Sequence, residues 1–256
     1  MTNEDIRRIA LEQSAVDMHC RPEDFLRDEY VITESGASEA ARKYLPLPFD
    51  CDMVSYGNNV VATVHPRYRD IVDAYLSRYP VAHALETPHL QALDDAFAPF
   101  NMGVCFMAEY FLPDMNRLQE LSCPYELRVL EPADFEGLYC DTWSNALCDK
   151  RKQLDRLAVG AYDNGALIGL AGCSADCDTM WQIGIDVLPG YRRQGVASAL
   201  TSRLALEVLN RGKVPFYCSA WCNVKSVRNA IKCGFQPAWV EVTVRSNDLI
   251  HEMNNT

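Results

Sequence analysis

The segment PGYRRQGVA, residues 189–197, combines residue types that bind phosphate groups. Gly190 and Gly195 loosen the backbone, and the apolar residues that follow predict that a helix begins near Gly195. The start of a helix carries unpaired N–H groups and a partial positive charge, which together favour a bound anion. Arg192 and Arg193 add two guanidinium groups, each able to grip a pair of phosphate oxygens. These features together point to a pyrophosphate.

The same segment could instead be an ordinary connection between a strand and a helix, with solvated arginines. Two other phosphate-binding patterns are absent, because the sequence has neither Gly-x-x-x-x-Gly-Lys-Ser/Thr nor a complete Gly-x-Gly-x-x-Gly. The order of the surrounding elements must therefore decide between the two interpretations.

The residues next to the turn predict a strand before it and a helix after it. MWQIGIDV (180–187) is an apolar run of strand length. GVASALTSRLALEVLNRG predicts a helix that ends at Gly212. Its apolar residues recur every four positions, at Val196, Leu200, Leu204 and Val208.

The elements further away follow a simple order. A strand over 126–130 leads to Asp134, which is expected to cap helical segments that continue to about Arg156. Two apolar runs then meet at Asp163-Asn164-Gly165, a strong hairpin pattern. Beyond the central helix, PFYCSAW predicts a buried strand, Asn223 caps a helix that ends at Gly234, and FQPAWVEVTVR supplies the last strand or strands.

This motif in this order resembles the GNAT superfamily of acyl-CoA-dependent N-acyltransferases over about residues 125–245. The family signature is Arg/Gln-x-x-Gly-x-Gly/Ala after a strand that ends in an apolar-x-Pro run. It is matched by Val187-Leu188-Pro189 and by Arg192-Arg193-Gln194-Gly195-Val196-Ala197. A later landmark, an Asn before a helix that closes in Gly-Phe, is matched by Asn223, Ser226 and Gly234-Phe235.

The resemblance implies an α/β (α+β) fold with a GNAT-like central sheet, mixed and mostly antiparallel, flanked by helices and preceded by a smaller mixed α/β N-terminal domain. It also implies acetyl-CoA as co-substrate. Val187 would set its backbone N–H against the thioester carbonyl. Asn223 would contact the pantetheine arm or the adjacent phosphate, or would only cap its helix. The pyrophosphate would be held by Arg192, Arg193, Gln194, Gly195, Val196 and Ala197.

Asp186 is our candidate for the general base. Strand alternation puts it on one face with Gln182 and Gly184, and puts Trp181, Ile183, Ile185 and Val187 on the other. Burial could raise its pKa towards a value useful for catalysis. Alternatively, Asp186 caps the turn or pairs with Arg192 or Arg193. Asp176 and Asp178 are rival bases, and ordered water could relay the proton instead.

The leaving thiolate also needs a proton or a hydrogen-bond donor. Many family members carry a Tyr four residues before the glycine that ends the helix, whereas this sequence has Ala230 there. Ser226, Tyr217 and Cys222 are the nearby candidates, and Ser226 joins Asp186 as a candidate catalytic residue. A typical thiol pKa of about 8.5 makes the CoA thiolate a fairly good leaving group in any case.

The first half of the chain differs from the second in charge. Residues 1–124 hold 10 Lys+Arg against 20 Asp+Glu, whereas residues 125–256 hold 14 against 15. We therefore expect two domains, 1–124 of unknown role, with substrate binding considered, and 125–256 as the acetyltransferase. The acidic half would attract a cationic amine bound between the halves, or would only keep the protein soluble. Residues 1–124 also predict helices over 3–18, 67–79 and 88–97 and a hairpin around Gly57-Asn58-Asn59.

Bulk composition narrows the class of protein further. The net charge of −11 argues against nucleic acid as a partner. The N-terminus lacks the pattern of a secretory signal, and Pro99, Asn101 and Glu109 interrupt the most apolar window, so we expect no membrane segment and a cytoplasmic location. The eleven cysteines are then expected to be reduced. The spacings CSADC and CSAWC differ from those usual in zinc sites, so no metal is expected.

These observations predict an N-acetyltransferase that moves an acetyl group from acetyl-CoA to a primary amine of a small molecule or peptide, by direct attack on the thioester. A homodimer is left open. One alternative is a non-catalytic acyl-CoA-binding or regulatory protein, motivated by Ala230. The other is an acyltransferase that uses a different acyl donor.

Overall fold

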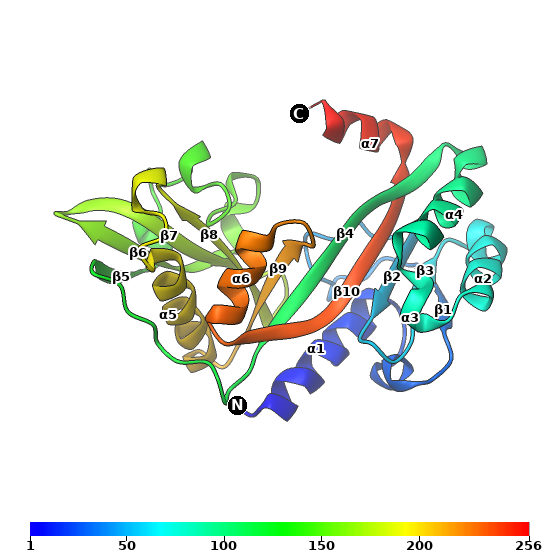
Figure 1. The fold of residues 1–256 in the computed structure, drawn as a ribbon, viewed down its shortest axis with the longest axis horizontal. Coiled ribbons are helices and arrows are strands. Elements are labelled where there is room, and N and C mark those ends of the chain that lie inside the picture. Colours follow the sequence, from blue (N-terminus) through cyan, green and yellow to red (C-terminus); the bar gives the residue numbers. More distant parts are fainter. Residues whose placement is uncertain (256) are drawn as a thin grey trace. The chain divides into compact units, whose positions relative to one another are not determined.

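Ten strands form a mixed, mostly antiparallel sheet flanked by helices in the computed structural model, which describes residues 1–255 (Figure 1). The α/β class and the mostly antiparallel sheet expected from the sequence are confirmed. Parallel pairing is found between β1 and β3 and between β8 and β9. The second of these parallel pairs adjoins the phosphate-binding motif.

The chain divides into two compact units. The first comprises Met1–Ala10 and Tyr110–Pro237, and the second comprises Leu11–Glu109 and the C-terminal segment from Ala238. This division differs from the expected boundary at residue 124. The reason is that helix α1 (Asn3–Asp17) and the 12-residue strands β4 (Met102–Pro113) and β10 (Phe235–Ser246) each have residues in both units.

In the first unit the strand order is β10-β4-β9-β8-β7-β6-β5. The β6–β7 hairpin is confirmed, because Asp163 pairs with Ala166 across a turn in which Asn164 and Gly165 have φ of 47° and 85°. Positive φ at both central residues is what a tight two-residue hairpin turn requires. The elements of this unit, beyond those shared with the second, are β5 (Glu126–Leu130), β6 (Asp155–Asp163), β7 (Ala166–Ser174), β8 (Met180–Val187), α5 (Val196–Asn210), β9 (Val214–Ala220) and α6 (Val224–Lys232).

Helix α5 covers one face of this sheet, packing on β6, β7 and β8 (Figure 1). Its four predicted core residues, Val196, Leu200, Leu204 and Val208, are all buried in the same apolar cluster. The four-residue spacing read from the sequence is therefore confirmed as the core-facing stripe of the helix.

The stretch between β5 and β6 contains less helix than predicted. It has only 3-10 turns, at Pro132–Asp134, Asp141–Trp143 and Asp149–Leu154. Asp134 does not cap a following helix, because its carboxylate accepts the backbone N–H of Glu131 and closes the turn behind it. Gly137, with φ of 82°, then leaves the helical conformation.

In the second unit the strand order is β1-β3-β2-β10-β4. The hairpin predicted around Gly57-Asn58-Asn59 is confirmed by antiparallel pairing of the strands on either side of it. No helix in the described part of the chain has the length and apolarity needed to cross a membrane. The elements beyond those shared with the first unit are β1 (Val31–Glu34), β2 (Cys51–Ser55), β3 (Val61–Val64), α2 (Arg69–Arg78), α3 (Val81–Ala84), α4 (Thr87–Phe97), α7 (Asn247–Asn254), and 3-10 turns at Pro22–Leu26, Pro66–Tyr68 and Ala98–Phe100.

Asp155, at the start of β6, makes the stability of the first unit dependent on pH. Its side chain is buried, and burial raises the pKa of its carboxyl from 3.8 to about 6. The folded protein thus holds a proton that the unfolded chain releases. Ionisation of Asp155 therefore lowers the free energy of unfolding as pH rises from about 4 to about 6. Above about pH 6 this lowering stays constant. Asp155→Asn should therefore raise the free energy of unfolding by about 2 kcal/mol at pH 8 and by little at pH 4.

Urea unfolding of the wild type and the variant at the two pH values measures this difference. The exposed Glu136→Gln substitution is the control, and it should shift stability by less than about 0.5 kcal/mol at either pH. An equal effect of Asp155→Asn at pH 4 and pH 8 would contradict the assignment.

Candidate functional site

The predicted phosphate turn lies between β8 and α5. A 3-10 turn at Pro189–Tyr191 follows β8, and Gly195 is the N-cap of α5 with φ of 83°. Arg193 is also left-handed, with φ of 65°. No side chain caps the start of α5. The first backbone N–H groups of the helix are therefore open to a ligand, and the exposed Arg192 and Arg193 are adjacent to them in sequence.

Four side-chain hydrogen bonds hold this turn in place. Arg192 Nε donates to the Val187 carbonyl at 3.0 Å, and Gln194 Nε2 donates to the Gly190 carbonyl at 3.1 Å. Tyr191 donates to Asp163 at 3.0 Å, and Tyr125 donates to the Gln194 side-chain oxygen. The Gln194 side chain thus stabilises the conformation of the turn. Within residues 1–255, the Arg192 side chain makes its hydrogen bond through Nε, to the Val187 carbonyl. Its two terminal amino groups can therefore bind an anion.

Strands β8 and β9 separate next to the turn. They pair in parallel from Met180–Val214 to Ile183–Tyr217, where the register ends, although β8 continues to Val187 and β9 to Ala220. A gap therefore opens between the C-terminal ends of two neighbouring strands. It opens at the same end of the sheet as the phosphate turn, because the turn directly follows β8.

The pairing of β8 with β7 shows which backbone groups face this gap. Leu188 N donates to Ile168 O, and the antiparallel ladder places Asp186 opposite Leu170. In such a ladder alternate residues bond to the same neighbour, so even-numbered residues of β8 bond to β7. The backbone groups of Ile185 and Val187 therefore point to the gap. The Val187 N–H, to which the resemblance assigns the thioester carbonyl, is among the groups that point to this gap.

A pair of hydroxyl groups lies between β9 and α6. Tyr217, in the last paired position of β9, has its hydroxyl 2.8 Å from Ser226 Oγ on α6. Burial raises the pKa of Tyr217, although hydrogen bonds from Ser226 and Asn229 act in the opposite direction. Both hydroxyl groups therefore stay protonated. One hydrogen is used in the bond between them, and the other can be donated to a ligand. Ala230, one turn further along α6, is fully buried and offers no polar group.

Asn223 is the N-cap of α6, because its side chain accepts the backbone N–H of Ser226 at 3.3 Å. The capping role weighed in the sequence analysis is confirmed. Asn223 is also exposed, at the end of the connection that follows β9. Its side-chain N–H₂ group remains for a ligand.

Asp186 bonds neither to the arginines of the turn nor to the turn itself. Its Oδ2 accepts the backbone N–H groups of Asn145 at 2.9 Å and Ala146 at 3.0 Å, and its Oδ1 accepts Asn145 Nδ2 at 2.7 Å. Three donors from one segment therefore hold this carboxylate, and both of its oxygens already accept hydrogen bonds. The rivals Asp176 and Asp178 precede β8, at its opposite end from the gap. Asp176 is buried and paired with Arg151 at 2.6 Å.

The sequence analysis missed the Asn145–Ala146 segment. Its backbone crosses the sheet over Gly172 of β7 and Gly184 of β8, which are directly opposite each other. A Cβ on Gly172 would lie 2.1 Å from the Ala146 carbonyl oxygen, and one on Gly184 would lie 1.8 Å from that of Asn145. The sequence pattern that could have predicted this contact is the presence of two glycines inside apolar strands, because glycine within a strand often marks a close approach of another backbone.

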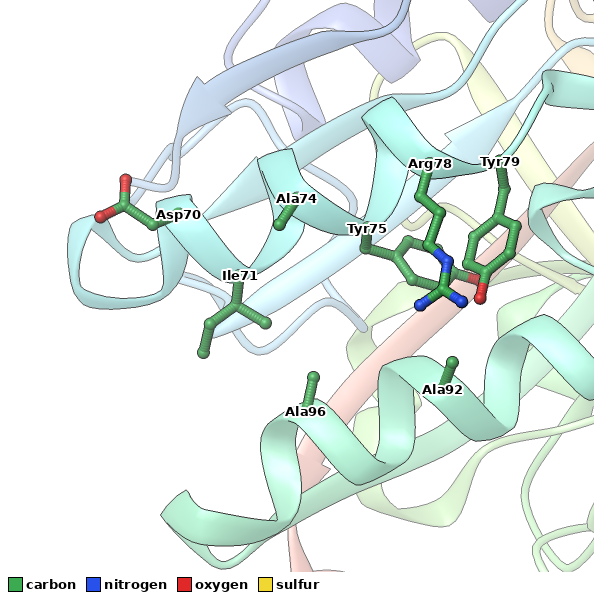
Figure 2. Close-up of a pocket in the computed structure, with 8 residues that line it drawn as sticks. All are labelled: Asp70, Ile71, Ala74, Tyr75, Arg78, Tyr79, Ala92 and Ala96. Carbon is green, nitrogen blue, oxygen red and sulfur yellow. The ribbon is translucent and has the colours of Figure 1, made fainter.

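Other features of the described residues do not add to this site. None of the eleven cysteines forms a disulfide within residues 1–255, and this part of the chain contains no cluster of three or more His, Cys, Asp or Glu side chains suited to a metal ion. The second unit has a groove of about 420 Å³ between α2 and α4, mostly apolar. Figure 2 shows Ile71 of α2 turned towards α4, on which Ala92 and Ala96 lie, with Arg78 and Tyr79 at one end.

An open helix start, strand amides that point to a gap and a hydroxyl pair on β9 and α6 are thus brought together by the elements that follow β7. The model of the Acetyltransferase (GNAT) family matches residues 119–235, slightly less than half of the chain. The resemblance noted in the sequence over about residues 125–245 is confirmed.

The chain is also similar to several solved structures. A GNAT-family acetyltransferase from Novosphingobium aromaticivorans has 18% identity and a TM-score of 0.43, over 56% of this chain and 66% of that one. A GCN5-related N-acetyltransferase-like protein from Streptococcus suis has 20% identity and a TM-score of 0.46, over 61% and 69%. An aminoglycoside N-acetyltransferase in complex with CoA has 22% identity and a TM-score of 0.36, over 47% and 93%. Comparison with curated proteins gave no match.

Proposed function

We propose that this protein transfers an acetyl group from acetyl-CoA to a primary amine of a small molecule or peptide, by direct attack of the amine on the thioester. The observation that carries the proposal is the gap between β8 and β9, which opens beside the phosphate turn. An extended thioester arm could enter the gap as its phosphates bind the turn. The match of residues 119–235 to the model of the Acetyltransferase (GNAT) family supports the same activity.

The cofactor would be held from its phosphates to its thioester. Arg192 and Arg193, with the first N–H groups of α5 at Val196 and Ala197, would bind the pyrophosphate. Gln194 would hold the shape of the turn and Gly195 would let the phosphate approach the backbone. Asn223 would reach the pantetheine arm. The Val187 N–H would donate to the oxyanion that develops on the thioester carbonyl.

The amine nitrogen would form a bond to the carbonyl carbon, the carbon–sulfur bond would then break, and the nitrogen would lose a proton. Ser226, backed by Tyr217, would donate a hydrogen bond to the departing thiolate. The three donors on Asp186 argue against it as the base, so we assign the amine proton to water.

Release of free thiol from acetyl-CoA, measured with a panel of primary amines, tests the proposal. The expected result is thiol release that depends on the amine, together with a thermal shift on adding acetyl-CoA. Longer acyl-CoAs and NAD serve as comparison ligands in the thermal shift. A shift with NAD alone would refute the proposal.

The buried Ala230 favours a second candidate, a protein that binds acyl-CoA without turnover. A shift with acetyl-CoA but no thiol release with any amine would support it. Faster thiol release from a longer acyl-CoA would instead indicate a different acyl donor.

A further inference from the structure

The Asn145–Ala146 segment is fixed to the sheet more tightly than an ordinary surface loop. It lies against Gly172 and Gly184 at distances that leave no room for a side chain. Asp186 binds two consecutive backbone N–H groups and one side-chain amide of this segment. Ala146 itself and the following Leu147 are buried in an apolar cluster. The segment therefore has one defined position.

This position is on the face of β8 that α5 does not cover. A Cβ on Gly169, which pairs with Val187, would meet Leu200 and Val196 of α5 at 3.0 Å. Odd-numbered residues of β8 thus face the helix, whereas Gly184 and Asp186 face the Asn145 segment. The α5 face is filled by the main apolar core. A second substrate would therefore reach the gap from the Asn145 side.

Asn145 offers a polar group on this face of β8. Its side chain is exposed, and its Nδ2 is committed to Asp186 at 2.7 Å. This bond orients the amide, so its Oδ1 is turned away from the carboxylate. Within residues 1–255 that oxygen has no hydrogen-bond partner, and an oriented carbonyl oxygen accepts an N–H. The Asp186 carboxylate, which accepts a hydrogen bond from Asn145 Nδ2, adds negative charge close to this oxygen.

We propose that Asn145, oriented by Asp186, is the acceptor-binding group of the gap and takes a hydrogen bond from the amine or ammonium of the substrate. This inference rests on the proposed function, and it assigns Asp186 as a positioning residue. Neither residue makes or breaks a bond. Their role is to hold the amine on the open face of β8, next to the Ile185 and Val187 backbone groups that line the gap.

Asn145→Ala tests this role while keeping the two backbone N–H groups that bind Asp186. Loss of one hydrogen bond to a charged group should raise the KM for the amine about tenfold. The KM for acetyl-CoA should stay within about twofold of wild type. Asp186→Asn should raise the amine KM similarly, and kcat should keep the pH dependence of the wild type. Asp28→Asn, the same charge change at an exposed aspartate of the second unit, is the control.

Calorimetric titration of the amine into protein saturated with CoA gives a second measurement that needs no turnover. Tenfold weaker amine binding by Asn145→Ala would support the proposal even if wild type released no thiol, in which case only the transfer activity fails. Unchanged amine affinity in this variant would overturn it. Loss of kcat by more than about 100-fold in Asp186→Asn, with a changed pH profile, would instead show that Asp186 is the base. Melting temperatures of all variants show whether each remains folded.

Discussion

Arg192→Glu is expected to weaken acetyl-CoA binding at least about 100-fold. The substitution removes a guanidinium from the phosphate turn and puts a carboxylate beside the open start of α5, where negative charge on the protein repels the phosphates. Two charge-assisted hydrogen bonds at about 1.5 kcal/mol each correspond to that loss of affinity. Isothermal titration with CoA at two salt concentrations measures it, and the wild-type affinity should fall as salt rises.

Arg156→Glu is the matched control, because Arg156 is an exposed arginine on β6 and the change in net charge is the same. It should leave CoA affinity within about twofold. Equal affinity of Arg192→Glu and wild type would remove the phosphate turn from the site. A parallel fall in both variants would show only a general effect of net charge.

Gly184→Ala is expected to lower the free energy of unfolding by about 3 kcal/mol. The new methyl group would lie 1.8 Å from the Asn145 carbonyl oxygen, so the segment must move or the strand must distort. Moving the segment breaks its bonds to Asp186, which leaves the amine site disordered as well. Urea unfolding gives the stability change, and the amine KM gives the second effect.

Gly190→Ala is the stability control for this substitution. A Cβ there meets nothing within 4 Å, and Gly190 lacks the positive φ that disfavours alanine. Its free energy of unfolding should stay within about 0.5 kcal/mol of wild type. If Gly184→Ala were equally harmless, the close contact at Asn145 would not hold in solution.

The parts predicted correctly from the sequence were those determined by local patterns. The Asn164-Gly165 turn, the α5 stripe and the Asn223 cap each depend on residues a few positions apart. Short-range spacing and turn chemistry are enough to specify them.

The parts that the sequence did not predict depend on contacts between distant residues. Asp186 was predicted to be a general base, or else to cap the turn or pair with Arg192 or Arg193. Its partners instead lie 41 and 40 positions earlier, in a stretch expected to be helical. The compact units likewise differ from the charge boundary at residue 124, because β4 and β10 are long enough to belong to both. Strand pairing over such separations leaves no local pattern.

The strands shared by the two units affect how the acetyltransferase part could be produced alone. A fragment that begins at residue 119, where the family match starts, would omit Phe111 of β4. That side chain is fully buried in the same core as Leu200 and Leu204. Its removal would leave a hole the size of a phenyl ring and an unpaired edge on β9, so a useful expression boundary lies upstream of β4. The segment that matches the family model is thus shorter than the compact unit that contains it.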